Sequence, residues 1–268
     1  MQKNIKHIAK APIGIFDSGL GGLSICKEIM KLLPNESIIY LADSLNAPYG
    51  EKTKDEIIQL SIKNTELLLS LNCKAIVVAC NTATTNSITT LRKQFDVPFI
   101  GIEPAIKPAA LQTKTRKIGV LATEGTLKSE LFLSTSEQFR DRIELIEVKG
   151  ENLVRFIEIG DIKKTKPLLK KYLSPMVEAG VDSIVLGCTH YPFLIPLIRE
   201  IIPENILIID SGEAVAKQTE VILRAENLLN KEATQKKNVF YTNNDVHVFK
   251  SFLKHINIRD DNALYKSF

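Results

Sequence analysis

Two cysteines follow short apolar runs in two closely similar segments of this 268-residue chain. Residues 76–84 read IVVACNTAT and place Cys80 after four small apolar residues, and residues 184–190 read IVLGCTH and place Cys188 in the matching position. An apolar run this short, bounded by turn and helix-capping residues, indicates a buried strand of a parallel sheet. Each cysteine is therefore expected at the carboxyl end of a strand, where open α/β sheets carry their ligand sites.

The residues after each cysteine could activate its thiol. We expect Asn81 or Thr82 to cap the next helix, whose N-terminal N–H groups and dipole favour a thiolate. His190 follows Cys188 by two residues, which suits a group that moves a proton or stabilises a thiolate. A lone cysteine after an apolar run is usually a small buried hydrophobe. Two cysteines at matching places, each before a polar cap, favour chemistry instead.

A glycine-rich segment follows the first expected strand, residues 13–16. It reads DSGLGG from Asp17 to Gly22, a poor match to the G-x-G-x-x-G loop, and its leading carboxylate repels a pyrophosphate. A nucleotide site is therefore disfavoured. An aspartate at the end of a strand suits the role of partner to a thiol or to a substrate ammonium group, and its structural alternative is a turn or helix-cap residue.

Strand and helix patterns repeat along the chain. Expected strands lie at 13–16, 37–41, 76–79 and 98–102, and again at 117–122, 143–148, 184–187 and 206–209. Expected helices end near Pro34, span 53–71 and end near Phe95 in the first half; in the second half one ends near Phe139 and others cover 152–179 and 192–202. A long helix after Gly212, a strand at 239–242 and a terminal helix complete the pattern.

The repeat indicates duplication of a βαβαβαβ unit, with Cys80 and Cys188 in equivalent places. We expect two similar α/β domains with parallel sheets, related by a pseudo-two-fold axis: residues 1–105 plus 213–268, and residues 106–212. The carboxyl ends of both sheets then face one cleft. Two thiols on opposite sides of a bound molecule can remove a proton from one face of a carbon and deliver a proton to the other.

Composition excludes several other classes. The chain is 44% hydrophobic and 25% charged, with a net charge of +4 that is small and scattered, so we expect no nucleic-acid partner. No apolar run has the length of a membrane span or a signal peptide, and four cysteines in a chain this long make no disulfide framework. The prediction is a cytoplasmic protein with free thiols. Cys26 and Cys73 are expected to be packing residues.

The sequence favours neither a zinc site at Cys188 nor a functional role for the other histidines. The sequence from Cys188 to His190 lacks the clustered ligand pairs that a structural zinc site needs. His7, His247 and His255 lie in basic or terminal segments and are expected to be solvated. Residues 1–12 form a short basic tail with little pattern.

Four motifs, in this order along residues 13–215, together resemble glutamate racemase, of the aspartate/glutamate racemase superfamily: FDSGLGGL at 16–23, APYG at 47–50, ACNTAT at 79–84 and GCTHYP at 187–192. The resemblance implies cofactor-independent production of D-glutamate for bacterial peptidoglycan, with no metal. It makes Cys80 and Cys188 the paired acid and base, with Cys80 acting on D-glutamate and Cys188 on L-glutamate. It also implies a substrate pocket lined by Asp17, Ser18, Tyr49, Gly50, Asn81, Thr82, Thr189 and His190.

The resemblance extends to supporting groups. It implies that Asp17 and His190 assist the two thiols, and that Glu158 matches the family's carboxylate in the second domain. Residues 149–152 read KGEN, where the family usually has a Cys-Pro pair, which bears on the alignment near Glu158. Family members are often homodimers, and we expect a homodimer with glutamate as its small-molecule substrate and no membrane partner.

Racemisation without a cofactor places a definite demand on the site. The α-proton of an amino acid carboxylate is a very weak acid, so fixed donors must stabilise a carbanion-like transition state without a pyridoxal electron sink.

The alternatives within the class are an aspartate or hydantoin racemase on the same scaffold. Outside it stand a thiol-redox protein and a non-catalytic amino-acid-binding module. A redox protein normally keeps its cysteines close in sequence, as C-x-x-C.

Overall fold

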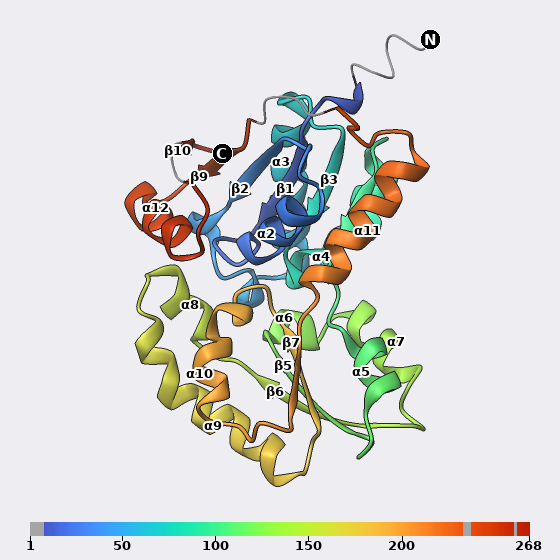
Figure 1. The fold of residues 1–268 in the computed structure, drawn as a ribbon, viewed down its shortest axis with the longest axis vertical. Helices are drawn as coiled ribbons and strands as arrows, with labels where there is room; N and C mark the ends of the chain where they lie inside the picture. Colours follow the sequence, from blue (N-terminus) through green and yellow to red (C-terminus); the bar gives the residue numbers. More distant parts are fainter. Residues whose placement is uncertain (1–7, 233–236, 260–261) are drawn as a thin grey trace.

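Two parallel sheets form the framework of the computed structural model, which describes residues 8–232, 237–259 and 262–268. The first sheet has the order β10-β9-β2-β1-β3-β4 and the second the order β6-β5-β7-β8 (Figure 1). The strands of the first are β1 (Ile13–Asp17), β2 (Ile38–Ala42), β3 (Ala75–Val78), β4 (Phe99–Gly101), β9 (Val239–Thr242) and β10 (Ala263–Tyr265). Those of the second are β5 (Lys117–Ala122), β6 (Glu144–Lys149), β7 (Ser183–Gly187) and β8 (Leu207–Ile209).

The two sheets share one strand order. In each, the first strand of the repeat lies between the second and the third, and the fourth lies outside the third. Ile13 of β1 pairs with Ile38 and Ala75, and Ile118 of β5 pairs in the same way with Leu145 and Ser183. All pairs in both sheets are parallel. The predicted fold of two similar α/β units is confirmed.

Helices cover both faces of each sheet, as parallel sheets require. Around the first sheet lie α2 (Leu23–Leu32), α3 (Lys54–Ser70), α4 (Asn81–Gln94), α11 (Gly212–Ala225) and α12 (Val246–His255). The second sheet carries α5 (Ile106–Gln112), α6 (Glu124–Leu127), α7 (Glu130–Glu137), α8 (Leu153–Glu158), α9 (Thr165–Glu178) and α10 (Ile195–Arg199). Short 3-10 turns follow strands β2 and β7 at η1 (Ser44–Asn46), η2 (Tyr49–Glu51) and η4 (Tyr191–Leu194), and η3 (Ile162–Lys164) joins α8 to α9. We call the two sheets with their helices the first unit and the second unit.

Buried apolar side chains join the two units. The central strands β1, β3, β5 and β7 are buried along nearly all of their length. One cluster of buried apolar side chains contains Leu20 and Leu23 of the first unit together with Leu153 and Leu186 of the second. Burial of this kind contributes about 25 cal/mol per Å² of apolar surface removed from water, so the contact between the units is stabilising in itself.

The structure differs from the expected elements in several places. The helix expected over 152–179 is divided into α8, η3 and α9, and helix α5 was not expected. The helix expected to end near Phe139 is divided into α6 and α7, because the Ser129 hydroxyl accepts the Phe132 N–H and starts a new helix. Strand β10, at the edge of the first sheet, was not expected, and it pairs with β9 through residues 263–265.

The chain returns to the first unit after the second sheet ends. Helix α11 packs against α2 of the first unit, and β9 and β10 extend the first sheet. We therefore propose the domain boundaries expected above, residues 1–105 plus 213–268 and residues 106–212. His247 and His255 are exposed, whereas His7 and the start of the basic tail lie outside the described residues.

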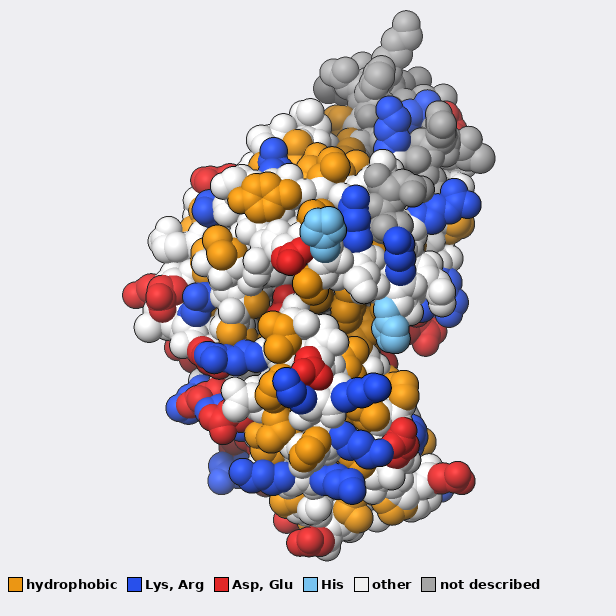
Figure 2. Space-filling view, turned by 90° about the vertical axis from the view of Figure 1, so that its left-hand side faces the viewer, with side chains coloured by type: hydrophobic (Ala, Val, Ile, Leu, Met, Phe, Trp, Pro, Cys, Tyr) orange, Lys and Arg blue, Asp and Glu red, His pale blue; other side chains and the backbone are white. Residues whose placement is uncertain are grey.

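The surface drawn in Figure 2 mixes charges of both signs. Lysine and arginine side chains lie among acidic and apolar ones over both units. In the described part of the chain, no helix combines the length and the apolar character needed to cross a membrane.

Candidate active site

A narrow pocket lies where the carboxyl ends of the two sheets meet. Its walls come from Ser18, Pro48, Tyr49, Gly50, Cys80, Asn81 and Thr82 of the first unit and Thr123, Val154, Cys188, Thr189 and His190 of the second. The cavity has a volume of about 10 Å³, whereas one water molecule already needs about 10–15 Å³. In this closed form the pocket therefore has no room for an amino acid, and groups around it must move to admit one.

Cys80 reaches the pocket as the N-cap of α4. Its Sγ accepts the backbone N–H of Ala83 at 3.4 Å, so the thiol itself occupies the capping position that we expected for Asn81 or Thr82. That expectation is wrong by one residue for Asn81 and by two for Thr82, because the chain enters the helix directly after Cys80 and Asn81 is already helical. The sulfur consequently lies at the positive end of the helix dipole.

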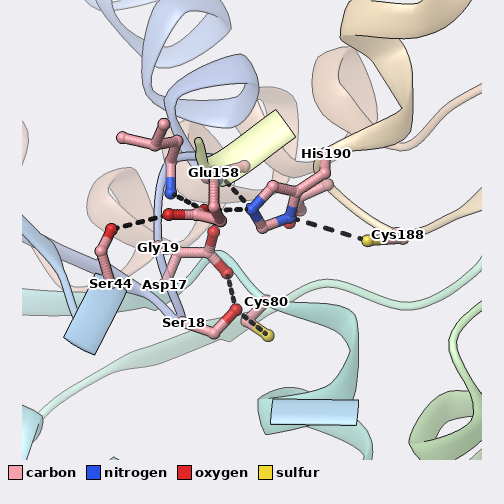
Figure 3. A network of polar contacts seen from close by, with 12 residues as sticks. Asp17, Ser18, Gly19, Ser44, Cys80, Glu158, Cys188 and His190 are labelled. Atoms are coloured by element: carbon pink, nitrogen blue, oxygen red, sulfur yellow. Dashed lines mark hydrogen bonds and ion pairs between the residues drawn. The ribbon is translucent and has the colours of Figure 1, made fainter. Parts of the chain in front are cut away.

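A hydroxyl and a carboxylate lie behind Cys80 (Figure 3). The Cys80 thiol donates to the Ser18 hydroxyl at 3.7 Å, and Ser18 donates to Asp17 Oδ1 at 3.4 Å. Asp17 is fully buried at the end of β1 and accepts the Gly22 N–H at 2.7 Å. Burial raises the pKa of Cys80 well above its ordinary value, and the charge of Asp17 adds to this, while the Ala83 N–H and Ser18 lower it. The net direction opposes the thiolate that the helix terminus alone favours.

An imidazole and a carboxylate lie behind Cys188 (Figure 3). The Cys188 sulfur lies 3.7 Å from His190 Nδ1, and His190 Nε2 lies 2.5 Å from Glu158 Oε1. Burial lowers the pKa of His190, but its hydrogen bonds to Cys188 and Glu158 outweigh burial and raise this pKa well above the ordinary value. A protonated imidazole donates from both nitrogens, and it therefore stabilises a thiolate at Cys188.

The glycines of the first loop make room for the second unit. A Cβ on Gly21 would lie 2.2 Å from Nδ1 of His190, and one on Gly19 would lie 2.1 Å from Oε1 of Glu158. The loop therefore accommodates two side chains of the second unit. This close approach explains why the loop is rich in glycine, and no bound nucleotide is needed to explain it.

Polar groups that could hold a substrate surround the thiols. Asn81 is 2% exposed, and in the described residues neither its amide nitrogen nor its amide oxygen has a hydrogen-bond partner. Such an orphaned amide in a pocket indicates a place for a ligand. The Thr82 hydroxyl lies 2.8 Å from that of Thr123 and 3.2 Å from that of Thr126, which joins the two units beside the pocket. No lysine or arginine is among the described lining residues, so neutral donors would bind a carboxylate.

The site residues expected from the sequence all lie at or directly behind this pocket. All except Asp17 and Glu158 line it, and these two lie behind the thiols. Tyr49 lines the pocket, but its hydroxyl donates to Asp43 at 2.5 Å and not to the cavity. Thr123 was missed, although the matching registers of the two sheets make it the equivalent of Ser18, which was the available signal. In the described residues, no group of His, Cys, Asp and Glu side chains could hold a metal ion.

A two-unit α/β fold with one thiol from each unit in a shared pocket is the arrangement of a known enzyme class. The chain belongs to the Asp/Glu/hydantoin racemase family, whose model matches residues 13–219. Its relatives within that family are named glutamate racemases. A glutamate racemase of Herpetosiphon aurantiacus is 45% identical over 84% of this chain and 89% of its own length.

Solved structures lead to the same group of proteins. Escherichia coli glutamate racemase, in complex with L-glutamate and the activator UDP-MurNAc-Ala, superimposes with a TM-score of 0.84 and is 31% identical, over 96% of this chain and 98% of that one. Glutamate racemase of Francisella tularensis, in complex with D-glutamate, gives a TM-score of 0.84 and 28% identity, over 97% of this chain and 98% of that one.

Proposed function

We propose that this protein interconverts L- and D-glutamate by acid–base chemistry at two thiols, without a cofactor. One observation carries the proposal: Cys80 and Cys188 follow equivalent strands of two matching sheets and line the same pocket. A single base tends to return its proton to the face from which the proton came. Two groups on opposite sides of Cα remove this restriction, and the relatives named glutamate racemase support the choice of substrate.

In the L to D direction, the Cys188 thiolate takes the α-proton and the C–H electron pair stays on Cα. The Cys80 thiol delivers its proton to the other face, which leaves Cys80 as the thiolate and Cys188 as the thiol. His190, held by Glu158, supports the Cys188 thiolate. Asp17 acts on Cys80 through Ser18.

The carbanion-like transition state needs fixed donors at the α-carboxylate. The orphaned Asn81 amide and the hydroxyls of Thr82 and Thr189 have the right chemistry, since they are held in place before the substrate arrives. Ser18, Tyr49, Gly50 and Thr123 also line the pocket. The Ser18 and Thr123 hydroxyls and the Gly50 N–H are neutral donors that suit the side-chain carboxylate of glutamate, whereas the Tyr49 hydroxyl is bound to Asp43.

The wider role follows from this activity. We infer that the D-glutamate serves peptidoglycan synthesis in the cytoplasm, and that the protein is a homodimer, as is common in its family.

A racemisation assay tests the proposal. The purified protein is incubated with L-glutamate in buffer treated with a chelator and free of pyridoxal phosphate, and the enantiomers are separated by chiral chromatography. We expect D-glutamate to accumulate to an equal mixture, and aspartate to react much more slowly. Activity that is lost with the chelator and restored by a metal would overturn the mechanism. Equal or faster turnover of aspartate would overturn the choice of substrate.

A further inference from the structure

Glu158 belongs to the second unit, but the first unit holds it in place. It ends α8, and both of its carboxylate oxygens accept hydrogen bonds from the first unit (Figure 3). The Leu20 backbone N–H donates to Oε1 at 2.6 Å, and the Ser44 hydroxyl donates to Oε2 at 2.8 Å. Apart from His190, the described residues of its own unit give this carboxylate no hydrogen bond.

The turn that carries Ser44 is itself braced. Asn243, directly after β9, accepts the Leu45 N–H at 2.9 Å through its amide oxygen. Its amide nitrogen donates to Asp43 at 2.5 Å, and Asn243 is 4% exposed. The Ser44 hydroxyl therefore projects from a turn fixed on both sides, which allows it to define where Glu158 lies.

We propose that Ser44 is a positioning residue for the Cys188 side of the site. Its hydroxyl fixes Glu158, Glu158 fixes His190, and His190 lies against the Cys188 sulfur. Because Ser44 and Glu158 come from different units, this half of the acid–base pair is assembled only when the units close. Ser44 does not line the pocket and acts only through this chain of contacts.

The two thiols differ in this respect. The partners of Cys80, Ser18 and the Ala83 N–H, belong to its own unit and are in place in an open protein as well. Loss of the Ser44 hydroxyl should therefore impair proton abstraction by Cys188 and spare abstraction by Cys80. The inference rests on the proposed two-thiol function.

Racemisation rates alone cannot reveal this asymmetry, because the two enantiomers have equal free energy and kcat/KM must be the same in both directions. An irreversible reaction avoids the constraint. With L- or D-3-chloroglutamate, one thiolate takes the α-proton, the C–H electron pair forms a Cα–Cβ double bond and chloride leaves. The resulting enamine takes up water and gives 2-oxoglutarate and ammonium, which are measured directly.

In Ser44→Ala we expect elimination from the L-analogue to fall about tenfold, the effect of one lost hydrogen bond to a charged group. Elimination from the D-analogue should stay within about twofold of the wild-type rate, because Ser44 is not among the partners of Cys80. Ser44→Thr keeps a hydroxyl and should restore the L-reaction, whereas Ser44→Cys, a poor donor of the same size, should not. Leu45→Ala is the control, since Leu45 is exposed on the same turn.

Cys188→Ser shows independently which enantiomer depends on Cys188, and the Ser44→Ala loss must fall on that enantiomer. Equal losses on both enantiomers in a folded Ser44→Ala protein, or no loss on either, would overturn the inference and leave the proposed function intact. A wild-type protein that does not racemise glutamate would overturn both.

Discussion

Cys80 and Cys188 occupy equivalent places but have unlike surroundings. Cys80 faces a hydroxyl and a buried carboxylate, and burial raises its pKa well above the ordinary value. Cys188 faces an imidazole whose pKa is itself raised by its hydrogen bonds to Cys188 and Glu158. Burial therefore favours the thiol form of Cys80, whereas the imidazole beside Cys188 can donate a hydrogen bond to its sulfur.

Alkylation at different pH values tests this difference, because the thiolate is the reactive form. At pH 7 iodoacetamide should label Cys188 well before Cys80. Labelling of Cys80 should grow only as the pH rises beyond 9, because a raised pKa moves its ionisation to higher pH. Cys73, whose pKa burial raises to about 12, and the fully buried Cys26 are internal controls that should stay unlabelled. Peptide mass spectrometry gives the order, and faster labelling of Cys80 at pH 7 would contradict the assignment.

The loop from Asp17 to Gly22 shows how one element can serve the site of the other unit. Its glycines leave space for the second unit's buried His190 and half-buried Glu158, whose side chains are held by hydrogen bonds and so cannot move aside freely.

We expect Gly21→Ala to reduce racemisation at least about 100-fold, because the added methyl group displaces His190 from Cys188 by more than hydrogen-bond tolerance. Gly212→Ala is the matched control, since its Cβ would meet no described atom closer than 3.1 Å. Both variants are assayed with L-glutamate, and thermal unfolding is followed in parallel. A folded Gly21→Ala protein with nearly wild-type activity would show that the close approach to His190 is unimportant.

The elements of this fold were largely predictable because buried parallel strands are short apolar runs that turn residues interrupt. Strand β10 has no such signal: among its three residues only Ala263 is buried, and β10 exists because β9 offers it an edge. The cap of α4 was misplaced because a cysteine is not a usual capping residue. The bond between Glu158 and Ser44 joins residues 114 positions apart, and only the packing of the two units brings them together.

At the scale of the whole molecule, the pocket is closed and has to open. Ion pairs join the two units beside it, at a rim that we call its mouth: Arg155 of α8 pairs with Glu51 at 2.5 Å, and Lys54 of α3 pairs with Glu130 at 3.3 Å. These side chains are largely exposed, and such pairs contribute only about 0–1 kcal/mol each. They order the closed state without preventing its opening.

Hydrogen exchange tests this opening. Saturating D-glutamate should slow amide exchange in residues 49–52 and 153–158, which meet across the mouth, because ligand binding favours the closed state. Exchange in α9, remote from the pocket, should change little. A uniform slowing over the whole chain would indicate general stabilisation and would contradict opening at the mouth.

The central claim is that each thiol serves one face of the substrate, and single serine variants test it most directly. Serine keeps the shape of cysteine but is a far weaker acid, so Cys80→Ser and Cys188→Ser should both lose racemisation by several orders of magnitude. Elimination from 3-chloroglutamate needs only one base and should survive for one enantiomer in each variant. We predict that Cys80→Ser still processes the L-analogue and Cys188→Ser the D-analogue. Equal residual rates on both enantiomers in both variants would contradict the two-thiol mechanism.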